Sequence, residues 1–186
     1  DHDGSEYAPW LTIQHALDTI PESGTIKVKS GVYYESIIFP SDKTIVLESV
    51  EGKDKTTILG LDSSATVTTD SCPEGTTLNG FTISHISSDE GVGILNSGPL
   101  TVSYCIISNN YSQYYGGGIY HHNGPLTIDS CIITNNVADY YGGGICNIYG
   151  DVFLNACTIS ANTATQSGGI HNKGNMTITN SEISDN

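Results

Sequence analysis

An internal repeat constrains this chain more than any other feature of the sequence. Four isoleucines, Ile94, Ile119, Ile145 and Ile170, recur at almost even spacing, and each opens a similar segment. The four segments read GILNSGPLTVSYCIISNN, GIYHHNGPLTIDSCIITNN, GICNIYGDVFLNACTISAN and GIHNKGNMTITNSEISDN. Self-similarity at a fixed period of this size predicts a repeat architecture, in which each unit buries its apolar side against the next.

Apolar and polar residues alternate within each repeat, which is the period of a strand and not of a helix. In the second repeat a turn near Ser130 is expected to reset the alternation. The inward-facing residues are then Leu126, Ile128, Cys131 and Ile133, and the outward-facing ones are Thr127, Asp129 and Thr134. Short strands with no crossover helices can bury their apolar side only by coiling around a common axis, which predicts an all-β parallel β-helix (solenoid).

The chain is expected to form one domain, residues 1–186, in three parts. Residues 1–24 are predicted to be an N-terminal cap, with Thr12 as the N-cap of a short helix that Pro21 ends. Residues 25–90 are predicted to form irregular first coils, and residues 91–186 regular coils of 25–26 residues.

Stacked coils turn equivalent positions into columns about 4.8 Å apart. One column is an expected asparagine ladder, whose amides hydrogen-bond from coil to coil: Asn110, Asn136, Asn162 and Asn186. A second is predicted to hold buried free thiols, Cys105, Cys131 and Cys157, and continues at Ser181. A third, predicted to be a turn ladder, contains Asn96, His121, Asn147 and Asn172.

The letters YYGGGI occur twice, at 114–119 and 140–145. Three successive glycines predict a corner at which positive φ is needed and neighbouring backbones stack closely. The tyrosines at and near this corner are the candidate binding residues: Tyr114, Tyr115, Tyr120, Tyr140 and Tyr141. They can stack on sugar rings, pack against a neighbouring subunit, or stiffen the corner by packing on one another.

No catalytic or metal site is predicted. Tyr120, Cys146 and His171 fall in one outward column, but two candidate ligands do not make a metal site, and an ordinary surface column is expected. The outward Asp129 has no acidic neighbour in its column, and the pair Asp89 and Glu90 is expected to be a solvated loop. An outward threonine row, Thr101, Thr127 and Thr177, is interrupted by Phe153. Asn110 and Asn175 begin glycosylation sequons.

Composition excludes some classes of partner. The net charge is −14, and all six basic residues are lysines, so nucleic acid and anionic membrane surfaces are poor partners. No apolar run is long enough to insert in a membrane, and no cofactor is expected. Any secretion signal is expected to be absent from the sequence.

Two stretches resemble known families. DGSEYAPWLTIQHALDTIPESGTIKVKSGVYYESIIF, residues 3–39, resembles the opening of the pectin-lyase-like superfamily, especially pectin methylesterases. The Gly-Gly-x-Ile and Ile-x-x-Asn motifs resemble the repeats of polymorphic membrane protein adhesins. The resemblance implies a right-handed, single-stranded β-helix. The motifs that carry catalysis in pectin methylesterases, pectate lyases and galacturonan hydrolases do not occur here, and the chain has no arginine.

The leading hypothesis is therefore a non-catalytic, extracellular or cell-surface β-helix with a structural or adhesive role. Its partner would be a second copy, bound through an uncapped C-terminal coil and able to build filaments, or a surface polysaccharide. The alternative hypothesis is a carbohydrate-binding or polysaccharide-degrading (lyase or hydrolase) module.

Overall fold

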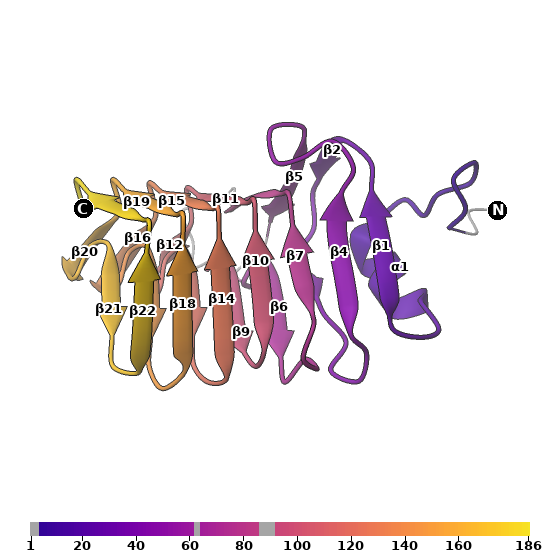
Figure 1. The fold of residues 1–186 in the computed structure, drawn as a ribbon. Coiled ribbons are helices and arrows are strands. Elements are labelled where there is room, and N and C mark those ends of the chain that lie inside the picture. The colour runs from indigo at the N-terminus through magenta and orange to yellow at the C-terminus, as the bar shows by residue number, and fades with distance from the viewer. Residues whose placement is uncertain (1–3, 62–63, 86–91) are drawn as a thin grey trace.

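A computed structural model describes residues 4–61, 64–85 and 92–186. Its strands lie in parallel sheets along a single rod, with the N-terminus at one end and the C-terminus at the other (Figure 1). Each regular coil, here called a rung, visits four sheets in turn. The predicted all-β parallel solenoid with one short helix is confirmed, with about six turns.

Sheet 1 holds, in spatial order, β1 (Gly24–Val28), β4 (Ile45–Ser49), β7 (Thr77–Asn79), β10 (Leu100–Ser103), β14 (Pro125–Asp129), β18 (Asp151–Asn155) and β22 (Asn175–Thr179). Sheet 2 holds β2 (Gly31–Tyr33), β5 (Thr56–Gly60), β8 (Thr82–His85), β11 (Ile106–Ser108), β15 (Ile132–Thr134), β19 (Thr158–Ser160) and β23 (Glu182–Ser184). Sheet 3 holds β12 (Tyr111–Ser112), β16 (Val137–Tyr141) and β20 (Thr163–Gln166). Sheet 4 holds β3 (Ile37–Ile38), β6 (Val67–Asp70), β9 (Ile94–Ser97), β13 (Ile119–His121), β17 (Ile145–Asn147) and β21 (Ile170–Asn172).

The register follows the repeat period. In sheet 1, Val102 pairs with Ile128, Ile128 with Leu154, and Leu154 with Ile178. The inward-facing residues fill a continuous core in which Leu126, Ile128 and Ile133 have no exposed surface. The first coils stack in the same sheets but less regularly, since the chain between the paired residues Leu47 and Leu78 is longer than a regular coil.

Two-residue corners join sheet 1 to sheet 2 in the regular rungs. The predicted turn at Ser130 has φ 54°, and its counterparts in other rungs also have positive φ: Gly80, Tyr104, Ala156 and Asn180. A second set of positive-φ residues, Asn109, Asn135, Ala161 and Asp185, lies directly before the asparagine column. An L-residue held in this region costs about 1–2 kcal/mol, so the neighbouring hydrogen bonds must offset it.

The asparagines of the ladder supply such bonds. Asn110 Nδ2 donates to Asn136 Oδ1 at 2.9 Å, Asn136 Nδ2 donates to Asn162 Oδ1 at 3.0 Å, and Asn162 Nδ2 donates to Asn186 Oδ1 at 2.9 Å. The same oxygens accept the backbone N–H of the asparagine one rung earlier, for example Asn110 N to Asn136 Oδ1 at 3.1 Å. Each side chain therefore ties its rung to the next, and the first three asparagines are fully buried. Asn110 is thus a poor glycosylation acceptor.

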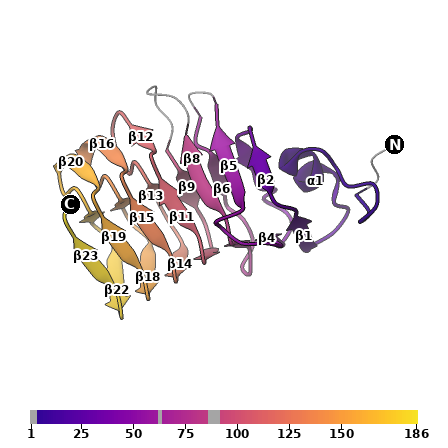
Figure 2. The same ribbon diagram turned by 90° about the horizontal axis from the view of Figure 1, so that it is seen from above.

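The short helix α1 (Ile13–Thr19) covers the first rung, as Figure 2 shows. Thr12 Oγ1 accepts the His15 N–H at 3.2 Å, which confirms the predicted N-cap. The carboxylate of Glu35 adds two bonds that the sequence did not reveal, from Ile13 N at 2.8 Å and Gln14 N at 2.9 Å. The helix buries its apolar face against the first coil through Ile13, Ala16 and Leu17.

Candidate functional site

The tyrosines of the two YYGGGI segments lie together where β12 and β16 lead into the glycine corner. Tyr114 stacks on Tyr140 with ring centroids 6.2 Å apart and planes 7° apart. Tyr115 stacks on Tyr141 with ring centroids 5.7 Å apart and an angle of 23° between the ring planes. Each partner comes from the neighbouring rung, so the rings follow the rod axis and cover part of one another's faces.

Further rings extend this cluster onto sheet 4. Tyr115 also stacks on Tyr120 at 6.0 Å, and Tyr141 contacts the ring of His171 at 4.5 Å. Lys173 Nζ lies 5.7 Å from the centroid of the Tyr141 ring. The structure thus brings all five candidate tyrosines into one cluster and uses many of their ring faces internally, which favours the stiffening interpretation. Their binding role stays a prediction.

The glycines beneath the tyrosines have the conformations that the corner requires. Gly116 and Gly142 have φ of 63° and 65°. A methyl group at Gly143 would clash with the Thr163 carbonyl oxygen in the next rung. Glycine is therefore needed here both for backbone conformation and for the close approach of rungs.

Cys146 pairs in register with Tyr120 on one side and His171 on the other, as the sequence predicted. The prediction that all three side chains form an ordinary exposed column is wrong for Cys146. The Cys146 side chain has no exposed surface, because it is smaller than the two rings that flank it. Burial raises the pKa of the Cys146 thiol to about 11, opposed by the charge of Lys173. At neutral pH the thiol is protonated and is a poor nucleophile.

The cysteine column holds three buried free thiols. Cys105 N–H donates to Cys131 Sγ at 3.4 Å, and Cys157 N–H donates to Ser181 Oγ at 3.0 Å. Each thiol also donates to a backbone carbonyl, as Cys157 does to Asn155 O at 3.2 Å. Burial raises the pKa of Cys157. The thiols and the serine therefore fill the same hydrogen-bonding role in successive rungs.

The third column contains two hydrogen-bonded pairs of side chains. Asn96 Nδ2 lies 2.8 Å from His121 Nδ1, and Asn147 Nδ2 donates to Asn172 Oδ1 at 2.7 Å. Asn96, His121 and Asn147 are fully buried. Within the described ranges, no three His, Cys, Asp or Glu side chains gather as a metal site would require. The predicted loop pair Asp89 and Glu90 lies outside the described residues.

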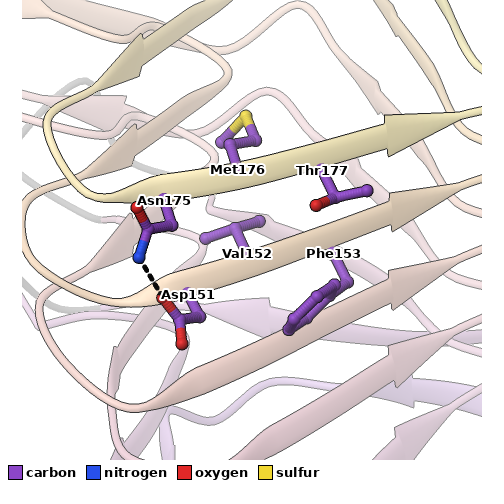
Figure 3. Close-up of a pocket in the computed structure, with 6 residues that line it drawn as sticks. All are labelled: Asp151, Val152, Phe153, Asn175, Met176 and Thr177. Carbon is purple, nitrogen blue, oxygen red and sulfur yellow. Dashed lines mark hydrogen bonds between the residues drawn. The ribbon is translucent and has the colours of Figure 1, made fainter.

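The outer face of sheet 1 carries a cluster around Phe153, of which the sequence showed only the interruption of the threonine row. Phe153 is 47% exposed in the row otherwise occupied by Thr77, Thr101, Thr127 and Thr177. Asp151 lies on the same side of β18, and Asn175 reaches across from β22 to donate to Asp151 Oδ1 at 2.8 Å (Figure 3). These residues line a shallow hollow of about 240 Å³. The only sequence signal was an aromatic residue at an outward position in a threonine row.

A second shallow hollow, of about 510 Å³, lies over β16 and β20 beside Tyr140 and Asp139. The carboxylate of Asp139 accepts the hydroxyl of Tyr111 at 3.0 Å. The two hollows lie on different faces of the rod, so the described surface offers two separate places where an exposed aromatic ring and a carboxylate adjoin.

The repeats match a known family. Residues 104–122 and 130–148 each match the Chlamydia polymorphic membrane protein (Chlamydia_PMP) repeat. These segments cover β11 to β13 and β15 to β17, and they contain the asparagine ladder's Asn110 and Asn136, both glycine corners and all five candidate tyrosines.

The fold matches solved structures of an enzyme. The pectin methylesterase from Aspergillus niger in deglycosylated form aligns with a TM-score of 0.67 and 21% identity, over 87% of this chain and 56% of that chain. The penultimately deglycosylated form of the same enzyme aligns with a TM-score of 0.57 and 15% identity, over 96% of this chain and 72% of that chain. The chain thus spans little more than half the length of the first.

This chain folds as a right-handed parallel β-helix, and two of its segments are similar to polymorphic membrane protein repeats. Both predicted resemblances are confirmed. No curated protein matches the sequence. The described part of this β-helix contains no helix with the length and hydropathy to cross a membrane.

Proposed function

We propose that this β-helix is a non-catalytic surface protein, exposed outside the cell, with a structural or adhesive role. The observation that carries the proposal is the match of two segments, each most of a rung, to a repeat named for a polymorphic membrane protein. These rungs expose Tyr114 and Tyr140 at about half of their surface, next to an interior that is tied together by ladders. A rigid rod with a raised aromatic edge suits contact with another surface.

Two measurements test this role. Antibodies against the protein should label intact cells of the source organism, and beads coated with it should retain those cells or their targets. The variant Tyr114→Ala/Tyr140→Ala should retain fewer, whereas Tyr7→Ala, at an exposed tyrosine near the cap, should not change retention. Labelling only after cell lysis would refute the surface location. Equal retention by all variants would refute the adhesive part.

Self-association is the second part of the proposal. Ile178 and Ile183 are 42% and 47% exposed, whereas their counterparts Leu154 and Ile159 are buried. A second copy that packs on these two side chains, in a dimer or end to end in a filament, would cover them. Sedimentation across a concentration series should show an assembly that Ile178→Lys/Ile183→Lys abolishes. A monomer at all concentrations would contradict it.

A polysaccharide-degrading role is the competing function, favoured by the pectin methylesterase fold alone. The two outward carboxylates of sheet 1 nearest each other in the repeats are Asp129 and Asp151, one rung and four residues apart. That spacing places them roughly 14 Å apart, beyond the roughly 5–9.5 Å used by glycoside hydrolases. Reducing-end assays on pectin should therefore show no hydrolysis. Methanol release from methylesterified pectin and unsaturated-product assays test the esterase and lyase reactions, for which we also expect no turnover. Turnover lost on Asp129→Asn or Asp151→Asn would overturn the proposal.

A further inference from the structure

We propose that Phe153 and the polar pairs beside it form a binding site for an uncharged polysaccharide on the outer face of sheet 1. The site is separate from the tyrosine cluster, and it does not depend on the surface role proposed above. It rests on three features: an exposed aromatic ring, amide and carboxylate pairs on both sides of that ring, and the local charge.

The ring provides the apolar part of the site. Phe153 stands 47% exposed in an otherwise small-residue row, with Thr127 one rung before it and Thr177 one rung after it. Among the described residues no other aromatic ring stacks on Phe153, whereas the tyrosines stack on one another. One face of a pyranose ring presents C–H groups, and these pack well on an aromatic ring that is open to solvent.

Polar pairs lie on both sides of the ring along β18. On one side, Asn175 Nδ2 donates to Asp151 Oδ1 at 2.8 Å. Figure 3 shows the other carboxylate oxygen of Asp151 pointing away from Asn175. On the other side, Asn155 Nδ2 donates to Asp129 Oδ1 at 2.6 Å. Two residues of strand separate each pair from Phe153, so the three groups span roughly 13 Å, enough for about two sugar rings.

The pairs are held in place before any ligand binds. Asn155 Oδ1 also accepts from Thr179 Oγ1 and Asn180 Nδ2, both at 3.0 Å. A carboxylate that receives one amide N–H keeps further acceptor positions for sugar hydroxyls, and such charge-assisted bonds are the stronger kind. Fixed side chains lose little conformational freedom on binding.

Charge selects among polysaccharides. Asp129 and Asp151 both carry carboxylates, and in the described repeats from residue 92 onward the single lysine, Lys173, lies over Tyr141 in the tyrosine cluster. A chain of uronate, sialate or sulfate groups would bring anions to two carboxylates without a compensating cation. The charge therefore excludes anionic chains, and the open ring with its hydroxyl-accepting carboxylates fits a neutral chain of hexose, pentose or N-acetylhexosamine units.

Calorimetric titration of the 186-residue protein tests this. The probes are the hexasaccharides of cellulose, mannan, xylan and chitin as neutral chains, oligogalacturonate as an anionic chain and chitosan as a cationic one. At least one neutral hexasaccharide should bind, with an affinity that changes little with salt. Phe153→Thr, which completes the threonine row, should weaken binding tenfold or more, and Asn175→Ala should weaken it several-fold. Phe153→Trp should bind at least as tightly as the wild type.

Tyr34→Ala is the matched control, because Tyr34 is 61% exposed and lines neither hollow. It should change the affinity less than twofold. The proposal is overturned if no neutral chain binds at millimolar concentration, if a charged chain binds most tightly, or if Phe153→Thr leaves the affinity unchanged. It is equally overturned if Tyr34→Ala abolishes binding, or if Phe153→Thr acts by breaking a dimer. Unchanged melting of Phe153→Thr rules out misfolding as the cause of its loss.

Discussion

The buried ring of His121 should make this β-helix less stable as the pH falls below about 6.5. Asn96 Oδ1 accepts the hydroxyl of Thr69 at 2.6 Å, so the amide group of Asn96 turns an N–H toward His121 Nδ1, 2.8 Å away. His121 Nδ1 must therefore accept, and Nε2–H donates to Gly124 O at 2.9 Å. The neutral ring satisfies both contacts.

A second proton on this ring would face the amide N–H of Asn96. Burial lowers the pKa of His121, the backbone partners at Gly124 and Asn96 oppose this, and the neighbouring His122 adds a smaller lowering. The unfolded chain takes up a proton near pH 6.5, which the folded chain does not. The contribution of His121 to the free energy of unfolding is then constant above about pH 6.5. Below that pH it falls by at most about 1.4 kcal/mol per pH unit, until the pH reaches the pKa of His121 in the folded chain.

The variant His121→Asn removes this titration and keeps the hydrogen bonds. Asn147, the next residue of the column, already donates to Gly150 O at 2.9 Å and to Asn172 Oδ1 at 2.7 Å. An asparagine at 121 can likewise donate to Gly124 O and accept from Asn96. Because it is smaller than histidine, it should cost about 1 kcal/mol at pH 7. Between pH 7 and pH 5 the wild type should lose up to about 2 kcal/mol relative to this variant.

Urea unfolding at pH 7, 6 and 5 measures both curves. The wild type should be the more stable protein at pH 7, and its advantage over His121→Asn should shrink as the pH falls toward 5. The exposed neighbour His122→Asn should follow the wild-type curve, which separates the buried ring from its surroundings. Parallel curves for the wild type and His121→Asn would refute the reasoning, because they would mean that His121 titrates alike in the folded and unfolded chains.

Three further predictions concern the ladders, the corner and the thiols. Asn136→Ala should lower the free energy of unfolding by about 3 kcal/mol, since it leaves Asn110 N without its acceptor and removes one of the acceptors of Asn110 Nδ2. Asn186→Ala, at the partly exposed end, should cost less, and equal costs in denaturant titrations would contradict this. Gly143→Ala should lower the free energy of unfolding by more than about 2 kcal/mol, because its methyl group would clash with Thr163 O. The control Gly24→Ala, whose methyl group would have its nearest contact at 3.6 Å, should melt close to the wild type. Similar melting of both variants would argue against the stacked corner. Burial raises the pKa of the Cys146 thiol to about 11, so Cys146 should resist iodoacetamide at pH 8 in the folded protein and react only after unfolding. Mass spectrometry measures the alkylation of Cys146. Rapid alkylation of the folded protein would show that the thiol is accessible.

Much of the fold could be predicted because a parallel β-helix converts sequence spacing into register. Residues one repeat apart, such as Asn110 and Asn136, lie directly above one another once the chain coils. The alternation of apolar residues then fixes which side chains face the core. Local signals were sufficient at the cap as well, where Thr12 begins the helix. The irregular first coils escaped this logic, because the segment between the paired residues Leu47 and Leu78 has no repeat to guide the alignment.

The sequence by itself determined the rod, its period, its ladders and its glycine corners, since each follows from one repeat stacked on the next. Only the tertiary structure decided how outward residues behave. It buried Cys146 between Tyr120 and His171, turned tyrosine faces onto one another, and set Asp151 and Asn175 beside an open Phe153. The physical reason is that strand alternation fixes on which side of a sheet a residue lies, whereas exposure depends on the sizes and conformations of side chains in neighbouring rungs.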